Sequence, residues 1–168
     1  MRRIKNPWVG KKEYFCFGCC PDNKDGVRMK FYADSEEVLS VWKPERQFQG
    51  WIDTLHGGIQ AVMLDEICAW AVILKLNTTG VTAKMEIRYK HSISTNDKYL
   101  LVRAKVTEVR RNIATIEASI VDSQGTICSQ ATCTYFTFPV EKAREMGMQE
   151  LQLDDKETTL DEIIETIS

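Results

Sequence analysis

The stretch GGIQAVMLDEICAWAVILKL, residues 57–76, decides the fold. It is too long for a strand, and its apolar side chains fall on almost every side of a helical wheel. A helix that is apolar all round is a buried helix. The sequence NTTG at 77–80 supplies residues at which such a helix ends. The sequence therefore predicts one long helix over 57–76 that other elements must cover.

Alternating segments on both sides predict the layer that covers this helix. Between residues 81 and 90 the odd positions are apolar and the even positions are polar or charged. This pattern is typical of a long strand with one buried face and one wet face. Similar patterns or β-prone compositions predict six strands in all: 27–32, 38–42, 81–90, 100–107, 114–120 and 127–138. A sheet wrapped around one helix satisfies all of these faces, so we predict an α+β fold with a largely antiparallel sheet.

The length and the charge exclude several classes of protein. The 168 residues correspond to one domain, and the net charge of −2 provides no general attraction to nucleic acid. The longest uninterrupted apolar run, residues 67–74, is far shorter than the ~20 residues that span a bilayer. Residues 1–8 lack the apolar core of an export signal. We therefore expect a cytoplasmic protein that binds neither nucleic acid nor a membrane.

The composition changes near residue 140. Residues 141–168 hold nine acidic and three basic side chains, a net charge of −6. Four apolar side chains in this tail recur at helical spacing: Leu160, Ile163, Ile164 and Ile167. Thr159 and Glu162 have the spacing of a capping box. We predict a domain over residues 1–140 and an acidic tail over 141–168 with a short helix, which either docks on this or a neighbouring subunit or stays solvated.

The cysteines do not have the spacing of a zinc finger. Cys16 and Cys19 have metal-ligand spacing, but no second Cys/His pair follows them, so we expect no metal site. Without an export signal, reduced thiols are expected. Cys128 and Cys133 are five residues apart, so on a strand they should face opposite sides. Cys68 lies among apolar residues and is expected to fill the core.

The stretch QGWIDTLHGG, residues 49–58, runs directly into the expected helix and carries the candidate chemistry. Gly57 and Gly58 allow a ligand to approach the backbone closely. The free N–H groups of the first helical turn suit an anion or a developing oxyanion. Asp65 and Glu66 lie in the most apolar helix, where an unpaired carboxylate is costly. At least one of them should face a cleft as a candidate base or nucleophile.

Each of these features also has a purely structural explanation. The His-Gly-Gly sequence is often no more than a tight turn, and His56 could be a hydrogen-bonded structural imidazole. Glu66 could form a salt bridge at a subunit contact. Geometry adds a constraint, because Asp65 lies about 12 Å beyond Gly57 along a helix. If both groups serve one carbonyl, a second copy of the chain must supply one of them.

Two motifs in this order resemble a known family. Residues 49–59, followed by Leu64-Asp65-Glu66, are similar to the His-Gly-Gly motif of hotdog-fold acyl-CoA thioesterases, most closely that of the phenylacetate-pathway (PaaI-like) branch. Residues 15–23, FCFGCCPDN, resemble the Cys-Phe-Gly-Cys-Gly-Pro-Asn leader that often precedes it. The resemblance covers roughly residues 13–139. It implies the hotdog fold, no cofactor, and sites between the subunits of a homodimer or homotetramer.

The resemblance also implies roles for individual residues. Asp65 matches the catalytic carboxylate, which attacks the thioester or activates water. Gly57 matches the backbone donor to the thioester oxygen, and His56 matches a residue that shapes that end of the site. Thr82 falls where some members have a serine near the catalytic acid. The other expected substrate contacts are Gln49, Gly50, Gly58, Glu66, Arg88, Lys90, Arg110 and Arg111.

Several points remain open at the level of sequence. The four basic residues in that set could bind the phosphates of coenzyme A, and a solvated strand edge explains them equally well. The chain departs from the family pattern at Cys20, where the leader usually has Gly, and at Gly50, where other branches have Asn or Gln.

The expected function is hydrolysis of an acyl-CoA thioester to free acid and coenzyme A. The alternative is a domain that binds acyl-CoA without turnover and does not need an ionised Asp65.

Overall fold

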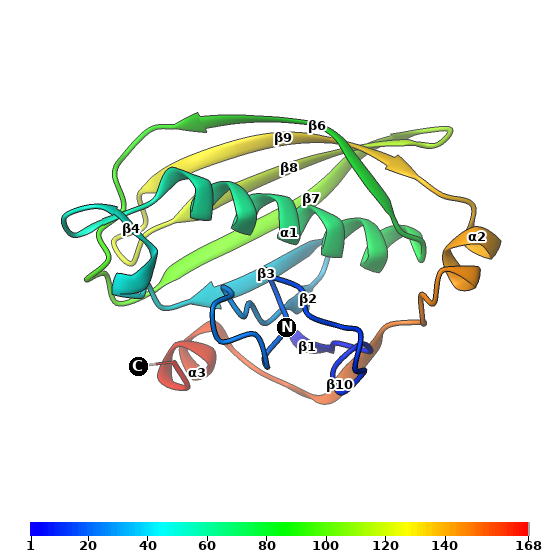
Figure 1. The fold of residues 1–168 in the computed structure, drawn as a ribbon, viewed down its shortest axis with the longest axis horizontal. Helices are drawn as coiled ribbons and strands as arrows, with labels where there is room; N and C mark the ends of the chain where they lie inside the picture. The colour runs from blue at the N-terminus through cyan, green and yellow to red at the C-terminus, as the bar shows by residue number, and fades with distance from the viewer. Residues whose placement is uncertain (168) are drawn as a thin grey trace.

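The structure, a computed structural model, describes residues 1–167. An eight-stranded antiparallel sheet curves around one long helix, α1 (Gly57–Leu76) (Figure 1). The strands of this sheet lie in the order β10 (Gln152–Glu157), β1 (Arg2–Lys5), β2 (Tyr32–Asp34), β3 (Glu37–Trp42), β7 (Leu100–Arg110), β8 (Ile113–Val121), β9 (Ile127–Thr137) and β6 (Gly80–Tyr89). The expected α+β arrangement of a sheet around a buried helix is confirmed.

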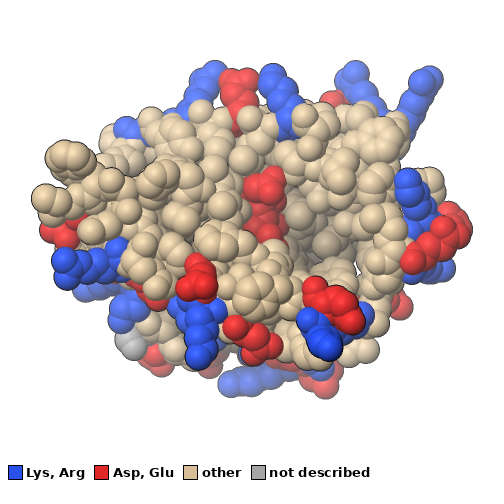
Figure 2. Space-filling view, viewed as in Figure 1, with Lys and Arg blue, Asp and Glu red and all other residues tan. Residues whose placement is uncertain are grey.

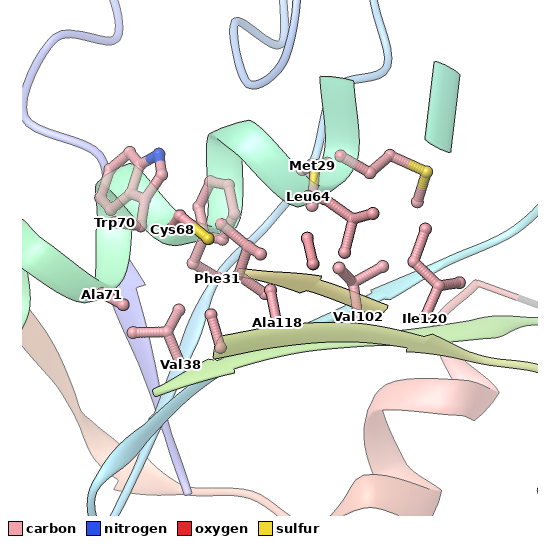
Figure 3. Close-up of a cluster of buried hydrophobic side chains, with 14 of the residues drawn as sticks. Met29, Phe31, Val38, Leu64, Cys68, Trp70, Ala71, Val102, Ala118 and Ile120 are labelled. Atoms are coloured by element: carbon pink, nitrogen blue, oxygen red, sulfur yellow. The ribbon is translucent and has the colours of Figure 1, made fainter. Parts of the chain in front are cut away.

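The helix α1 has the bounds that the sequence predicts. Its buried side chains interleave with those of β7 and β8 (Figure 3), where the labelled residues include Leu64, Cys68, Val102, Ala118 and Ile120. On another side, the Trp70 ring stacks on Phe31 with ring centroids 4.6 Å apart. The helix ends at Asn77, which adopts a left-handed conformation with φ 49° and donates its N–H to the carbonyl of Ile73.

The strand predicted over residues 27–32 does not form over most of its length. Residues 27–31 are not part of the sheet, and the strand there, β2, begins only at Tyr32. Arg28 has a φ of 58°, which interrupts an extended chain. The segment is nevertheless buried on its apolar side, and it bonds to a different partner. The N–H groups of Val27 and Met29 donate to the carbonyls of Phe17 and Gly18. Residues 27–31 therefore bind the loop of residues 15–23, called the leader loop below, instead of pairing with a strand.

The strand β6 also differs from expectation. It is the last strand in the sheet order, hydrogen-bonded only to β9. Its alternation predicted one buried face, yet Val81 is 52% exposed and Tyr89 is 53% exposed. Among its apolar side chains, only Met85 and Ile87 are half-buried. The reason is that β6 is the edge strand of the sheet, and within residues 1–167 little covers the apolar side chains near its two ends.

The cysteines are all free thiols. The expectation that Cys128 and Cys133 face opposite sides is wrong, because both are fully buried in one core cluster. The register between β8 and β9 shifts between Ile120 and Val121, which places a bulge at Cys128 and changes the alternation. Cys133 instead lies near Cys68, and both belong to the core cluster. In the described part of the chain, no helix is long and apolar enough to cross a membrane.

The acidic tail is folded onto the sheet. It forms α2 (Val140–Glu145), the edge strand β10 paired with β1, and α3 (Leu160–Glu165). The predicted capping box is confirmed, because the Thr159 hydroxyl accepts from the Glu162 N–H and the Glu162 carboxylate accepts from the Thr159 N–H. Ile163 of α3 packs on Leu39 and Val41, which point away from α1. The domain boundary at residue 140 stays a prediction.

Replacing Ile163 by Ala tests how firmly the tail is docked. The side chain is 3% exposed, so the substitution should lower the free energy of unfolding by about 2 kcal/mol, the lower end for a buried Ile→Ala change. The measurement is the urea midpoint at unchanged slope. As a control, Ile127→Ala removes a side chain that is 40% exposed and should cost clearly less. Equal, small effects of the two substitutions would show that α3 is not part of the folded unit.

Candidate functional site

The start of α1 carries an unpaired backbone donor. The His56 Nδ1 accepts a hydrogen bond of 2.8 Å from the Gly58 N–H, which makes His56 the N-cap of the helix. The N–H groups of Ile59 and Gln60 donate to the His56 carbonyl. Among residues 1–167, no group accepts a hydrogen bond from the Gly57 N–H. This donor therefore lies at the positive end of the helix dipole and is available to an oxyanion.

Two glycines allow the approach of a hairpin to this cap. The strands β4 (Gln49–Trp51) and β5 (Thr54–Leu55) form a separate two-stranded ribbon that leads into α1. A Cβ on Gly50 would lie 2.8 Å from the His56 Cδ2 and 3.0 Å from its Cα. A Cβ on Gly58 would lie 2.9 Å from the His56 Nδ1. Close packing against His56 thus explains why both positions are glycine. Contact of Gly50, Gly58 and the exposed Gln49 with substrate stays a prediction.

Asp65 lies two turns further along α1 and meets β6. The Thr82 hydroxyl donates to the Asp65 Oδ1 at 2.7 Å, so the structure brings together the two residues that the sequence paired only by resemblance. Asp65 is half-buried. Beneath it, burial and then the charge of Asp65 raise the pKa of the Tyr135 hydroxyl above its ordinary value. The carboxylate thus has one hydrogen-bonded oxygen and one oxygen available.

Figure 2 shows acidic atoms on the same face of the molecule. Acidic atoms lie in the middle of a face that is otherwise mostly uncharged, over the position of α1 in Figure 1. Asp65 and Glu66 are the acidic residues of this helix. A half-buried carboxylate on a mostly uncharged face is a candidate reactive group.

Glu66 has a different environment from its neighbour. Its Oε1 accepts a hydrogen bond of 3.0 Å from the Trp70 indole N–H, and the Cys16 thiol donates to its Oε2 at 3.4 Å. No Lys, Arg or His within residues 1–167 forms an ion pair with it. The structure therefore directs Glu66 to the leader loop, and its role as a substrate contact stays a prediction.

Tyr89 is a site residue that the sequence analysis missed. Its hydroxyl donates to the Gly57 carbonyl at 3.0 Å, and its ring is the nearest group to a Cβ on Gly57, at 3.6 Å. Because the ring is half-exposed, it forms part of the wall beside the free Gly57 N–H. The only signal in the sequence was the alternation of β6, which did not indicate that the end of this strand crosses the helix start.

The four basic candidates fall into two separate pairs. Arg88 lies near the end of β6 and Lys90 directly follows the strand, on either side of Tyr89. Arg110 and Arg111 lie at the β7–β8 turn, and the register Arg110–Ile113, Ile113–Phe136 and Phe136–Val81 places that turn at the opposite end of β6. All four are exposed. One chain therefore does not bring them together, and their binding to coenzyme A stays a prediction.

A cavity of about 690 Å³ lies elsewhere, between the N-terminal segment and the end of β3, and Cys19, Arg28, Phe31 and Trp42 contribute to its walls. A second one of about 340 Å³ lies over the outer side of β6, β8 and β9. Neither is lined by Asp65, His56 or Gly57. We therefore assign the candidate site to the exposed side of α1 and β6 on the basis of its chemistry.

A comparison with known families finds one match. Residues 53–129 match the thioesterase superfamily. This segment includes the helix N-terminus, Asp65 and β6. A comparison with curated proteins found no match.

Solved structures of thioesterase-superfamily proteins share the fold. One protein of this superfamily has a TM-score of 0.67 and 21% identity, over 70% of this chain and 58% of that one, so this chain spans less than two thirds of its length. Zebra fish thioesterase superfamily member 2 has a TM-score of 0.62 and 23% identity, over 68% and 86% of the two chains. A hypothetical thioesterase from Streptococcus pneumoniae TIGR4, solved with coenzyme A, has a TM-score of 0.61 and 22% identity, over 66% and 85%. The fold is the hotdog fold, as expected.

Three glycine substitutions test the geometry around His56. Gly50→Ala and Gly58→Ala place a methyl group within 3.0 Å of His56 atoms, so each should lower the free energy of unfolding by about 1–3 kcal/mol through overpacking. Gly57→Ala is the matched control, because its nearest neighbour at 3.6 Å is an ordinary contact. It should be neutral or stabilise by up to ~1 kcal/mol. Urea unfolding measures all three, and equal effects would contradict this account of the cap.

Proposed function

We propose that this chain hydrolyses acyl-CoA thioesters to a free acid and coenzyme A, with Asp65 as the catalytic carboxylate. The observation that carries the proposal is the half-buried Asp65, held by Thr82 on the helix whose N-terminus presents the free Gly57 N–H. The match of residues 53–129 to the thioesterase superfamily supports it. So does the structural neighbour that was solved with coenzyme A. We assign the chain, on its leader and His-Gly-Gly motifs, to the phenylacetate-pathway (PaaI-like) branch.

The chemistry requires one nucleophile and one oxyanion donor. Asp65 either attacks the thioester carbon or removes a proton from the water that attacks it. The carbonyl oxygen then gains negative charge, which the Gly57 N–H and the helix dipole stabilise. When the carbonyl re-forms, the C–S bond breaks and coenzyme A leaves as a thiolate. If Asp65 removed the proton from water, the free acid forms in this step and Asp65 returns that proton to the thiolate. If Asp65 attacked, water then hydrolyses the acyl–Asp65 anhydride, which releases the acid, regenerates the carboxylate and supplies the proton that the thiolate takes up. Thr82 orients the carboxylate through Oδ1, which leaves Oδ2 to react.

Each site uses two copies of the chain. Gly57 and Asp65 are eight residues apart on one helix, about 12 Å at the helical rise. A donor and an attacking group must each lie about 3 Å from the same carbonyl group. In a symmetric dimer, Gly57 of one copy faces Asp65 of the other, so two equivalent sites form.

The exposed edge of β6 supports this dimer. A ten-residue edge strand with exposed Val81 and Tyr89 is a surface that proteins normally cover. Antiparallel pairing of β6 with its copy continues the sheet and removes both edges. A two-fold axis at Met85 sets Glu86 of each copy opposite Lys84 of the other, which makes the pairing electrostatically self-complementary.

The same pairing brings the basic residues together. Arg88 and Lys90 lie at one end of β6, and the turn with Arg110 and Arg111 lies at the other. Antiparallel pairing places the first pair of one copy at the same end of the joined sheet as the second pair of its partner, with the partner's β6 and β9 between them. The result is a positive region next to the Gly57 end of each site, which suits the phosphates of coenzyme A.

Asp65→Asn tests the catalytic carboxylate. The substitution keeps the hydrogen bond from Thr82 and the size of the side chain, so the urea midpoint should stay close to that of the wild type. Turnover should fall by at least ~10²-fold, as expected for loss of an essential acid–base or nucleophilic group. Thiol release from short, medium and aromatic acyl-CoAs measures it. Asp161→Asn, an exposed carboxylate on α3, is the matched control and should be fully active.

The outcome also separates the two candidate functions. Wild-type turnover that survives in Asp65→Asn would remove the carboxylate from the mechanism. Saturable binding of acyl-CoA without turnover by the wild type would replace the hydrolase with a binding domain.

Mixed subunits test the shared site. Gly57→Pro removes the proposed donor, and proline is tolerated at the first position of a helix, especially after His56 with its ψ of 133°. Alone, this variant should lose about 10²–10³-fold in turnover. Co-expressed with Asp65→Asn, it should recover about a quarter of wild-type activity, since half of randomly paired dimers then hold one intact site. If both groups act within one chain, co-expression restores nothing.

A further inference from the structure

The leader loop and α1 bring together three potential metal ligands that lie far apart in the sequence. The sulfur atoms of Cys16 and Cys19 and a carboxylate oxygen of Glu66 all lie within 4.8 Å of one another. Glu66 is 50 residues from Cys16 in the chain, so its approach is a product of the fold. The sequence predicted no metal site because no second Cys/His pair follows Cys16 and Cys19, whereas the third potential ligand is a carboxylate.

The spacing of these atoms suits a tetrahedral ion. At Zn–S of about 2.3 Å and Zn–O of about 2.0 Å, tetrahedral ligands lie about 3.5 Å apart. The Cys16 Sγ is 3.4 Å from the Glu66 Oε2. Small shifts of the side chains are therefore enough to close three ligands around one ion. A fourth position is left for a water molecule at the half-exposed side of Cys16.

The surroundings hold the ligands in place. The Gly18 N–H donates to the Cys16 Sγ at 3.3 Å, and the Trp70 indole N–H donates to the Glu66 Oε1 at 3.0 Å. The Tyr14 hydroxyl lies 2.8 Å from the Cys19 Sγ. Outer contacts of this kind orient metal ligands and increase their affinity.

Gly18 shows how closely the loop covers the carboxylate. A Cβ at this position would lie within 2.8 Å of three side-chain atoms of Glu66, the closest being Oε2. Hydrogen bonds from Val27 to Phe17 and from Met29 to Gly18 fix the loop from the other side. The loop is thus built around the position of this carboxylate, and a larger residue at 18 would displace it.

This cluster has no basic side chain beside it to balance the charge of ionised ligands. A carboxylate and two thiols that can ionise meet in a half-buried place, and within residues 1–167 no basic side chain forms an ion pair with Glu66. Anionic groups at such short range repel one another unless a cation lies between them. Two thiolates exclude Mg²⁺ and Ca²⁺, which prefer oxygen, and the carboxylate disfavours Cu⁺. This donor set is typical of Zn²⁺.

We propose that Cys16, Cys19 and Glu66 bind one Zn²⁺ ion, with water in the fourth position, and that the ion fastens the leader loop to α1. Glu66, the ligand of this ion on α1, directly follows Asp65 in the sequence. Its side chain lies on the side of α1 that the leader loop covers. Its role is therefore to hold the helix turn that carries Asp65 against the leader.

The test is the zinc content of the full-length chain. The protein is purified without a polyhistidine tag, kept reduced, supplied with zinc and desalted, and the metal is measured by mass spectrometry. The wild type should retain about one zinc per chain. Cys16→Ser and Glu66→Gln should each bind zinc at least ~100-fold more weakly, because loss of a ligand exceeds the effect of losing an outer contact. Both retain side chains of similar size, and unchanged far-UV circular dichroism checks their fold.

Two controls make the result specific. Cys128→Ala removes a buried thiol outside the cluster and should retain zinc. Asp65→Asn changes the neighbouring carboxylate and should retain zinc while losing hydrolysis, so failure of the zinc site and failure of the proposed hydrolysis are separable. With Co²⁺ in place of Zn²⁺, the wild type should show thiolate-to-metal absorption that Cys16→Ser lacks. A chelator should lower the Tm of the wild type and leave that of Cys16→Ser unchanged.

Three results would overturn the proposal. The first is a reduced, zinc-supplied wild type that keeps no metal after desalting. The second is equal zinc content in the wild type, Cys16→Ser and Glu66→Gln. The third is a Cys16–Cys19 disulfide in protein isolated under reducing conditions, since oxidised sulfurs do not bind zinc.

Discussion

The burial of α1 inside a curved sheet is the constraint on which the rest of the structure depends. A helix that is apolar on every side needs cover on every side, and the sheet provides it on one side only. Phe31 and the leader loop around Gly18 cover another side. The part of the helix next to β6 is left open. The reactive groups that this protein presents lie at these two borders of the buried helix.

The pair Asp65 and Glu66 shows the consequence. The two residues are adjacent, so their side chains leave the helix about 100° apart. Asp65 emerges at the open border and meets Thr82, whereas Glu66 emerges beneath the leader and meets Cys16 and Trp70. Desolvation is costly for both, and each is stabilised by different partners. One helix thereby serves two kinds of chemistry, a proposed nucleophile on one side and a proposed metal ligand on the other.

Local patterns explain the predictions that the structure confirmed. The bounds of α1, the long strands β6 to β9 and the Thr159 capping box depend on side chains within a few residues of one another. Residues 27–31 were predicted wrongly because alternation records burial and does not record which backbone supplies the hydrogen bonds. The tail strand β10 was missed because its sequence, QLDDKE, has almost no apolar alternation, and it forms only by pairing with β1.

By itself, the sequence determined the buried helix, the strands around it, the glycines at the helix start and the carboxylate in the middle of the helix. These follow from periodicity and from short-range hydrogen bonding. Only the tertiary structure decided that Thr82 meets Asp65, that Tyr89 reaches Gly57, and that the leader sulfurs reach Glu66. These contacts join residues 17 to 50 positions apart. They exist because packing a sheet and a leader on one helix brings distant segments within a few ångströms, and no local pattern contains that information.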